Sequence, residues 1–236
     1  MLDILFVTDF VCPFCIVGKE ALKEAIRETG IDARIRIQPM ELTEEPKERV
    51  DTYHDEVRKA HYEVLKQPAK NLGLDMKFPP KVIPRPYTRL AWEGWFYAKE
   101  KGLGDEYSDL MYRAYFIDEK DIGDIDILSD LAGSIGLDPK EYRKVLEDGI
   151  YYNEEKEATS YSRSTLEVKG IPTLFINGER VKMSSFTKEE AIELLTGASH
   201  ESQENGFFGC GPDGCGEASE AEEESCGGCG PDGCQF

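Results

Sequence analysis

The sequence predicts an α/β domain that is interrupted by a large helical insertion and followed by a cysteine-rich tail. Three observations indicate this: a strand–helix–strand pattern over residues 2–38, helical patterns over 44–167, and a strand, a hairpin and a helix after Gly170. With 236 residues, the chain can form one large domain or two small ones, each with a proper core.

The opening residues predict a β-α-β unit. Residues 2–8 (LDILFVT) are mostly apolar, as in a strand buried on both faces. Apolar residues then recur at helical spacing over 13–28, and Gly30 closes this helix. Residues 33–38 (ARIRIQ) alternate between apolar and polar side chains, as in a half-buried strand. The loop between the first strand and the helix therefore carries Cys12.

The middle of the chain, residues 44–167, is expected to be helical because its apolar residues recur at helical spacing. Asp138 supplies an N-cap, Pro139 suits the first helical position, and Glu141 completes a capping box. The stretch FPPKVIPRP at 78–86 can be neither helix nor central strand, so it predicts a loop between helices.

The last structured part is expected to be a hairpin followed by a helix. Residues 172–176 and 179–183 read as two strands, and Asn-Gly at 177–178 is a strong hairpin signal between them. A capping box at 187–190 opens a final helix, which we expect Gly197 to end.

The composition divides the chain into three parts. We expect 1–43 and 168–198 to form the α/β domain, 44–167 to form the insertion with a connecting helix, and 199–236 to form a flexible tail. The tail holds nine acidic residues, nine glycines and five cysteines but no Lys or Arg, so it has little to bury.

The charge and hydropathy exclude several functions. Lys and Arg total 28 against 47 for Asp and Glu, and the resulting net charge of −19 disfavours nucleic acid as a partner. No apolar run approaches the roughly 18 residues of a membrane helix. Asp3 and the lack of a basic start disfavour a signal peptide, so we expect a cytoplasmic protein that needs no membrane partner.

Cys12-Pro13-Phe14-Cys15 lies between the first strand and the first helix. A helix N-terminus stabilises a thiolate, and the three-residue separation places Cys15 where it can attack a mixed disulfide formed at Cys12. As half of a zinc site, the pair needs further ligands, and the tail holds the only other cysteines. Two inert buried cysteines are the remaining alternative. The context favours redox chemistry.

These residues resemble the thioredoxin superfamily, and more closely its DsbA-like branch, over about residues 2–197. The CPFC motif, the helical insertion and the sequence Gly-Ile-Pro-Thr at 170–173 carry the resemblance. It implies a thioredoxin-like fold and a protein disulfide oxidoreductase with catalytic Cys12 and Cys15. It also implies that Pro172 is cis and shapes the substrate site, and that the backbone of Ile171 pairs with bound substrate.

Within this branch, the segments TDFVCPFCIVGK and YRAYFIDEKDIGDIDILSDLA are similar to FrnE-type proteins, which are cytosolic and in some cases carry a second cysteine pair. Glutathione-dependent isomerases and transferases, such as 2-hydroxychromene-2-carboxylate isomerase and the kappa-class transferases, belong to the same branch. They usually have serine at the first active-site position. A glutathione-dependent isomerase or transferase that uses Cys12 is therefore the alternative function.

The resemblance also bears on substrates. The partners it implies are protein thiols and disulfides or glutathione, and it requires no cofactor. We expect Pro13 and Phe14 to contact substrate, with Phe14 at an exposed helix start. The motif lacks the histidine of periplasmic DsbA proteins, which predicts a less oxidising couple, suited to reductase or isomerase work.

The five tail cysteines allow three interpretations. They form a second redox pair, they bind a soft ion such as zinc or copper(I), or they are dispensable. The repeated block GCGPDGC contains turn residues that would bring paired sulfurs close together, which suits both active interpretations. A metal-binding protein that acts through its tail is thus a non-enzymatic alternative. The cysteines are Cys210, Cys215, Cys226, Cys229 and Cys234.

Overall fold

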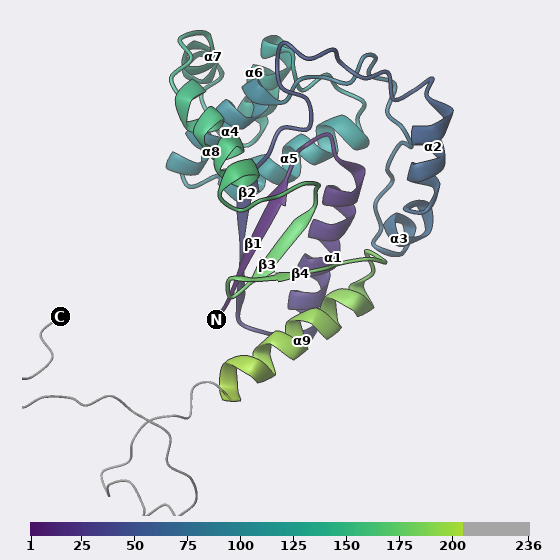
Figure 1. Cartoon of the computed structure of the whole chain (residues 1–236). Helices are drawn as coiled ribbons and strands as arrows, with labels where there is room; N and C mark the ends of the chain where they lie inside the picture. The colour runs from purple at the N-terminus through teal and green to yellow at the C-terminus, as the bar shows by residue number, and fades with distance from the viewer. Residues whose placement is uncertain (205–236) are drawn as a thin grey trace, which may run out of the picture.

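Four strands form one mixed sheet in the order β2-β1-β3-β4 in a computed structural model that describes residues 1–204, with side chains through residue 199 (Figure 1). Strand β1 pairs parallel with β2 and antiparallel with β3, which pairs antiparallel with β4. The strands are β1 (Leu2–Thr8), β2 (Ala33–Pro39), β3 (Thr173–Ile176) and β4 (Glu179–Val181).

Strand β1 is central, and its apolar sequence explains this position. Ile4 pairs with Ile35 of β2 on one side and with Ile176 of β3 on the other. Phe6 and Val7 are buried, as a strand covered on both faces requires. The pairing brings the end of the chain's first strand beside residues more than 160 positions away, and this places the loop after β1 against the loop before β3.

Helix α1 (Pro13–Thr29) and helix α9 (Lys188–Glu204) pack against each other, and α9 also contacts β1. Gly30 caps α1 in the left-handed conformation with φ 66°, as predicted. The prediction that Gly197 ends the last helix is wrong. Gly197 does not adopt a positive φ, and α9 continues to Glu204, crossing residue 199, where the tail is predicted to begin.

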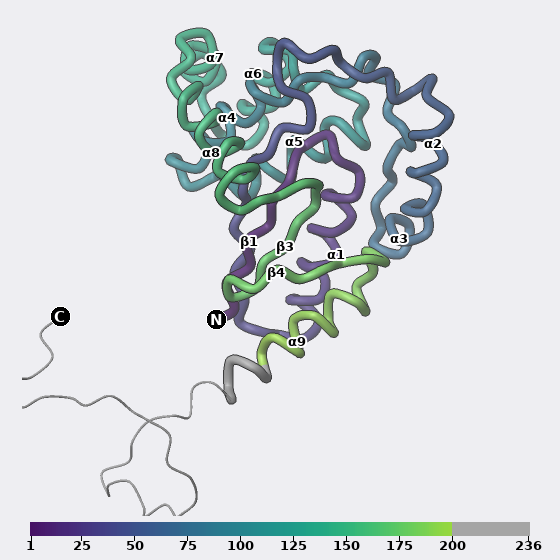
Figure 2. The backbone as a smooth tube through the Cα atoms, in the orientation of Figure 1, coloured from purple at the N-terminus to yellow at the C-terminus, as the bar shows by residue number. Residues whose placement is uncertain are grey.

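The insertion between β2 and β3 is helical, as predicted, although residues 44–55 form turns rather than helix. The loop at 78–86 is confirmed, and Asp138 caps the helix that begins at Pro139. Figure 2 shows α2 and α3 at the edge of the view, apart from the sheet. The helices are α2 (Glu56–Glu63), α3 (Lys66–Asn71), α4 (Arg89–Glu100), α5 (Gly104–Phe116), α6 (Ile125–Ser134), α7 (Pro139–Glu147) and α8 (Tyr152–Ser164).

The hairpin between β3 and β4 is confirmed at the predicted residues. Asn177 and Gly178 both have positive φ, at 52° and 89°, as a two-residue hairpin loop requires. Its strands are shorter than expected, since Pro172 precedes β3 and Met183 follows β4.

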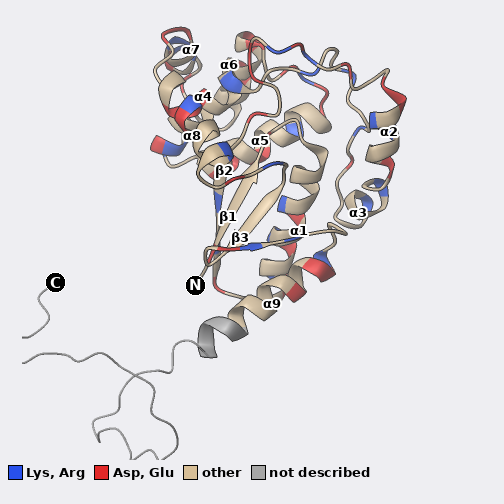
Figure 3. Cartoon of the chain, viewed as in Figure 1, with Lys and Arg blue, Asp and Glu red and all other residues tan. Residues whose placement is uncertain are grey.

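One apolar core runs from the sheet into the insertion, so the two parts are folded around shared side chains. Figure 3 shows Lys and Arg interspersed with Asp and Glu over the described helices. Within residues 1–204, no helix combines the length and the apolar character that a membrane crossing needs.

Candidate active site

Cys12 occupies the N-cap of α1, at the point where the chain leaves β1. Its backbone is extended, its N–H donates to the carbonyl of Asp9 at 3.1 Å, and its carbonyl accepts from the Cys15 N–H at 3.1 Å. Pro13 fills the first helical position, where its missing N–H leaves no helical bond unmade. The predicted placement of the motif at a helix N-terminus is therefore confirmed.

Both motif cysteines are buried, and Cys15 is buried completely. The Cys12 residue is 3% exposed and Cys15 is 0% exposed. Burial raises the pKa of the Cys15 thiol well above its usual range, and the adjacent Cys12 raises it further. The complete burial of Cys15 and the raised pKa of its thiol suit Cys12 to react with a substrate first and Cys15 to react afterwards with Cys12.

The loop before β3 lies directly against Cys12. The Ile171–Pro172 bond is cis, as the resemblance implies, and the Cys12 Sγ lies 3.7 Å from the carbonyl oxygen of Ile171. Pro172 also borders a cavity of about 330 Å³ whose lining includes Arg180 and Lys182. Pro172 therefore adjoins both this cavity and the Ile171 carbonyl that Cys12 contacts, although neither cysteine lines the cavity.

The residues expected to contact substrate are less accessible than predicted. Pro13 is buried, while Phe14 and Ile171 are half-buried. Phe14 is not at an exposed helix start, because its ring packs against Phe186 with centroids 5.3 Å apart. Phe186 belongs to the segment before α9. The residues around the CPFC motif give no sign that this distant segment packs against Phe14.

Two hydroxyl groups beside Cys15 were missed by the sequence analysis. The Thr8 and Tyr112 hydroxyls form a hydrogen bond with each other, and Thr8 also interacts with the Cys15 thiol. Thr8 is the last residue of β1, whereas Tyr112 belongs to α5. Tyr112 is buried, and its hydroxyl bonds Thr8 beside the cysteine pair.

Asp9 links the same loop to the helical insertion. Its buried carboxylate accepts hydrogen bonds from the Leu42 N–H at 2.7 Å and from the Trp92 Nε1 at 3.2 Å. Burial raises the pKa of Asp9, and the two donated hydrogen bonds counteract this rise. The carboxylate therefore fixes the backbone from which the Cys12 turn starts.

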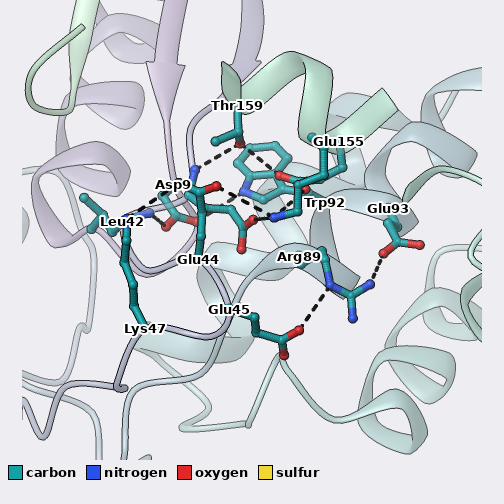
Figure 4. A network of polar contacts seen from close by, with 12 residues as sticks. Asp9, Leu42, Glu44, Glu45, Lys47, Arg89, Trp92, Glu93, Glu155 and Thr159 are labelled. Carbon is teal, nitrogen blue, oxygen red and sulfur yellow. Dashed lines mark hydrogen bonds and ion pairs between the residues drawn. The ribbon is translucent and has the colours of Figure 1, made fainter. Parts of the chain in front are cut away.

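A pair of buried carboxyl groups, Glu41 and Glu155, lies near Asp9, between the end of β2 and helix α8. Figure 4 shows Glu155 of this pair close to Asp9 and Thr159. Glu155 accepts a hydrogen bond from Thr159 at 2.9 Å, and Lys156 lies 2.8 Å from Glu41. Burial, followed by repulsion from Glu155, raises the pKa of Glu41 to about 8 in spite of Lys156. Within the described residues, these side chains are not arranged to hold a metal ion.

Because of this pair, the stability of the protein should fall as the pH rises from about 5 to 8.5. Glu41 has a pKa of about 8 in the folded chain against an ordinary value of 4.5, so the folded state binds more protons in this window. The free energy of unfolding should drop by a few kcal/mol, since one pKa unit corresponds to about 1.4 kcal/mol. Urea unfolding at several pH values measures this slope.

The matched controls are two neutral substitutions. Glu41→Gln should flatten the slope, because it removes the group that titrates. Glu48→Gln, at an exposed position in the same segment, should leave the slope unchanged. A Glu41→Gln variant that keeps the wild-type pH dependence would show that this carboxyl group does not hold the proton.

The five tail cysteines lie outside the described residues. Of the predicted site residues that are described, the fold brings together Cys12, Cys15, Pro13, Phe14, Ile171 and Pro172.

The sequence of this chain is similar to those of known proteins. The family described as the DSBA-like thioredoxin domain matches residues 3–197. The uncharacterized protein YwbO of Bacillus subtilis (strain 168) is 38% identical over 175 residues, which cover 74% of this chain and 86% of YwbO.

Three solved structures share the fold. The probable DsbA oxidoreductase SCO1869 from Streptomyces coelicolor has a TM-score of 0.71 at 24% identity, covering 93% of this chain and 100% of its own. A 2-hydroxychromene-2-carboxylate isomerase has a TM-score of 0.66 at 16% identity, covering 88% and 100%. The cytosolic disulfide reductase DsbM from Pseudomonas aeruginosa, with GSH, has a TM-score of 0.58 at 15% identity, covering 86% and 99%. The predicted thioredoxin-like fold with a helical insertion is confirmed.

Proposed function

We propose that this chain, which belongs to the family of DSBA-like thioredoxin domains, is a thiol–disulfide oxidoreductase in which Cys12 attacks and Cys15 resolves. One observation carries the proposal: two free cysteines in the first turn of a helix lie against a cis-proline loop. The N-terminus of α1 favours the negative charge that sulfur carries while it attacks or leaves.

The reaction proceeds in two exchanges. The Cys12 thiolate attacks one sulfur of a substrate disulfide, forming a mixed disulfide and expelling a thiolate that takes up a proton. The Cys15 thiolate then attacks the Cys12 sulfur, and the second substrate thiolate leaves. Two electrons pass from the protein dithiol to the substrate, and a disulfide forms between Cys12 and Cys15. The reverse sequence oxidises a substrate dithiol.

Replacing Cys15 by serine should trap the intermediate. With glutathione disulfide, the wild-type chain should pass on to the Cys12–Cys15 disulfide, whereas Cys15→Ser should accumulate the glutathione adduct at Cys12 almost completely. Trypsin makes this measurable by mass spectrometry, because residues 1–19 hold both motif cysteines and residues 189–236 hold all five tail cysteines. If the variant does not accumulate the adduct, Cys15 is not the resolving residue.

The Cys15→Ser variant also distinguishes the proposed oxidoreductase from the alternative function. The fold shared with 2-hydroxychromene-2-carboxylate isomerase keeps a glutathione-dependent isomerase or transferase as the second candidate. Such an enzyme uses Cys12 alone to activate glutathione, so Cys15→Ser should leave its activity intact. An oxidoreductase should lose its turnover with the same substitution.

The finer assignment is a FrnE-type protein of the cytoplasm that acts on protein thiols or glutathione. In support of it, one structural neighbour is described as a cytosolic disulfide reductase and was solved with GSH. The cavity beside Pro172 is lined by Lys182, which suits a carboxylate of glutathione, and by Arg180, whose guanidinium also donates to the backbone carbonyls of Leu166 and Glu167. No cofactor is required for this chemistry.

We extend the proposal to the tail as a second redox pair that exchanges with Cys12 and Cys15. Its alternatives are a site for zinc or copper(I) and a dispensable segment. The tryptic peptide 189–236 reports the redox state of Cys210, Cys215, Cys226, Cys229 and Cys234 in the same digest.

A further inference from the structure

We propose that Tyr112, a side chain of the helical insertion, holds the Thr8 hydroxyl so that it donates a hydrogen bond to the Cys15 thiolate during resolution. Tyr112 is thus a positioning residue that acts through Thr8, and the inference rests on the proposed function. Through Tyr112, the helical insertion would contribute to the reaction of the cysteine pair that follows β1.

The geometry places three groups in a row inside the protein. Thr8 and Cys15 are each 0% exposed, and Tyr112 is 2% exposed. The Tyr112 hydroxyl is bonded to the Thr8 Oγ1, and the Thr8 hydroxyl and the Asp9 backbone N–H both interact with the Cys15 sulfur in the sense that lowers the thiol pKa. A thiolate at this depth depends on such protein donors, because bulk water does not reach it.

Either hydroxyl can be the donor in the bond between Tyr112 and Thr8, and we assign this role to Tyr112. Each hydroxyl has one proton to donate. Among the described residues, Thr8 is the hydrogen-bond partner of the Tyr112 hydroxyl. When Tyr112 donates to Thr8, the Thr8 proton is available to Cys15. Without the Tyr112 hydroxyl, the Thr8 oxygen loses the partner that holds its proton toward Cys15.

The Tyr112 ring is held in place by its neighbours. Phe10 packs edge-on against it with centroids 5.4 Å apart, and the Lys19 Nζ lies 5.7 Å from the ring centroid. Lys19 is itself held by Ser108 and Asp109, each at 2.8 Å. The hydroxyl is therefore pre-positioned, and removing it leaves the ring contacts in place.

The step that this unit serves is the second exchange with glutathione disulfide. The Cys15 thiol gives up its proton, its sulfur bonds to the Cys12 sulfur, and the bond from Cys12 to glutathione breaks. The glutathione thiolate leaves and takes up, by exchange with solvent, the proton that Cys15 released. Stabilising the Cys15 thiolate raises the fraction of protein that is ready for this step.

The test is the pH profile of resolution in the full chain, followed on the tryptic peptide 1–19 after acid quenching. Tyr112→Phe should shift the profile by about one pH unit to the alkaline side and slow resolution about tenfold at pH 7. Thr8→Val should have at least the same effect, and adding Tyr112→Phe to it should change little. Thr8→Ser, which keeps the hydroxyl, should restore the wild-type profile.

Tyr142→Phe is the matched control, because this buried tyrosine bonds the Tyr107 hydroxyl at 2.6 Å and not a group at the cysteine pair. An unshifted profile for Tyr112→Phe, or an equal shift for Tyr142→Phe, would overturn the inference. If the wild-type chain forms no mixed disulfide, the proposed function fails instead. Titration of the Cys15 thiol by NMR in a Cys12→Ser background, which needs no reagent to reach the buried sulfur, then still decides whether Tyr112 acts on this thiol.

Discussion

Replacing Cys12 by serine should abolish disulfide exchange at the motif, lowering its rate by a factor on the order of 10³ or more, because a nucleophile has no substitute. Cys15 cannot take over, since it is fully buried and its thiol pKa is raised by burial. The measurement is the rate at which tryptic peptide 1–19 reacts when the reduced chain is mixed with glutathione disulfide.

The control for this prediction is Cys15→Ser, which should keep the first exchange near the wild-type rate. The tail peptide 189–236 serves as an internal reference, because it carries its own thiols in every variant. If peptide 1–19 of the Cys12→Ser chain still reacts at a comparable rate, then Cys15 is the attacking residue and the assigned roles are reversed.

Replacing Gly94 by alanine should cost about 3 kcal/mol of stability or more, at the upper end of what overpacking a core causes. Gly94 lies in α4, where two buried tyrosines approach the helix backbone. A Cβ there would lie on the Tyr142 hydroxyl and 2.5 Å from the Tyr107 hydroxyl. Both rings would have to move, and their mutual hydrogen bond would be strained or lost. Urea unfolding of the variant gives the loss directly.

Gly197→Ala is the matched substitution in α9. Nothing lies within 4 Å of a Cβ added at Gly197, so alanine there should be neutral or stabilise the helix by up to about 1 kcal/mol. A Gly94→Ala variant that loses no more stability than Gly197→Ala would show that the insertion core is loosely packed around the tyrosine pair.

The sequence predicted the elements whose signals are local. The buried strand at 2–8, the helix that Cys12 caps and the Asn-Gly hairpin at 177–178 each depend on residues next to one another, and all three are confirmed. The end of α9 was predicted wrongly at Gly197, because glycine tolerates helical backbone as well as the left-handed cap.

The rest of the site depends on contacts between distant segments. Thr8 and Tyr112 are separated by 104 positions in the chain, so no local pattern links their hydroxyls. Glu41 follows the end of β2 and Glu155 lies in α8, and charged residues are expected at the surface unless the fold pairs them. When tertiary packing brings a distant side chain to the cysteines, the residues next to it in the sequence do not reveal that contact.

Equilibrating the wild-type chain with glutathione buffers of graded redox potential tests the reactivity of the Cys12–Cys15 pair most directly. Peptide 1–19 should convert reversibly from dithiol to internal disulfide in one two-electron transition, in which the ratio changes tenfold per roughly 30 mV. A peptide that stays a dithiol throughout, or that is oxidised and never reduced again by glutathione, would contradict a role in thiol–disulfide exchange.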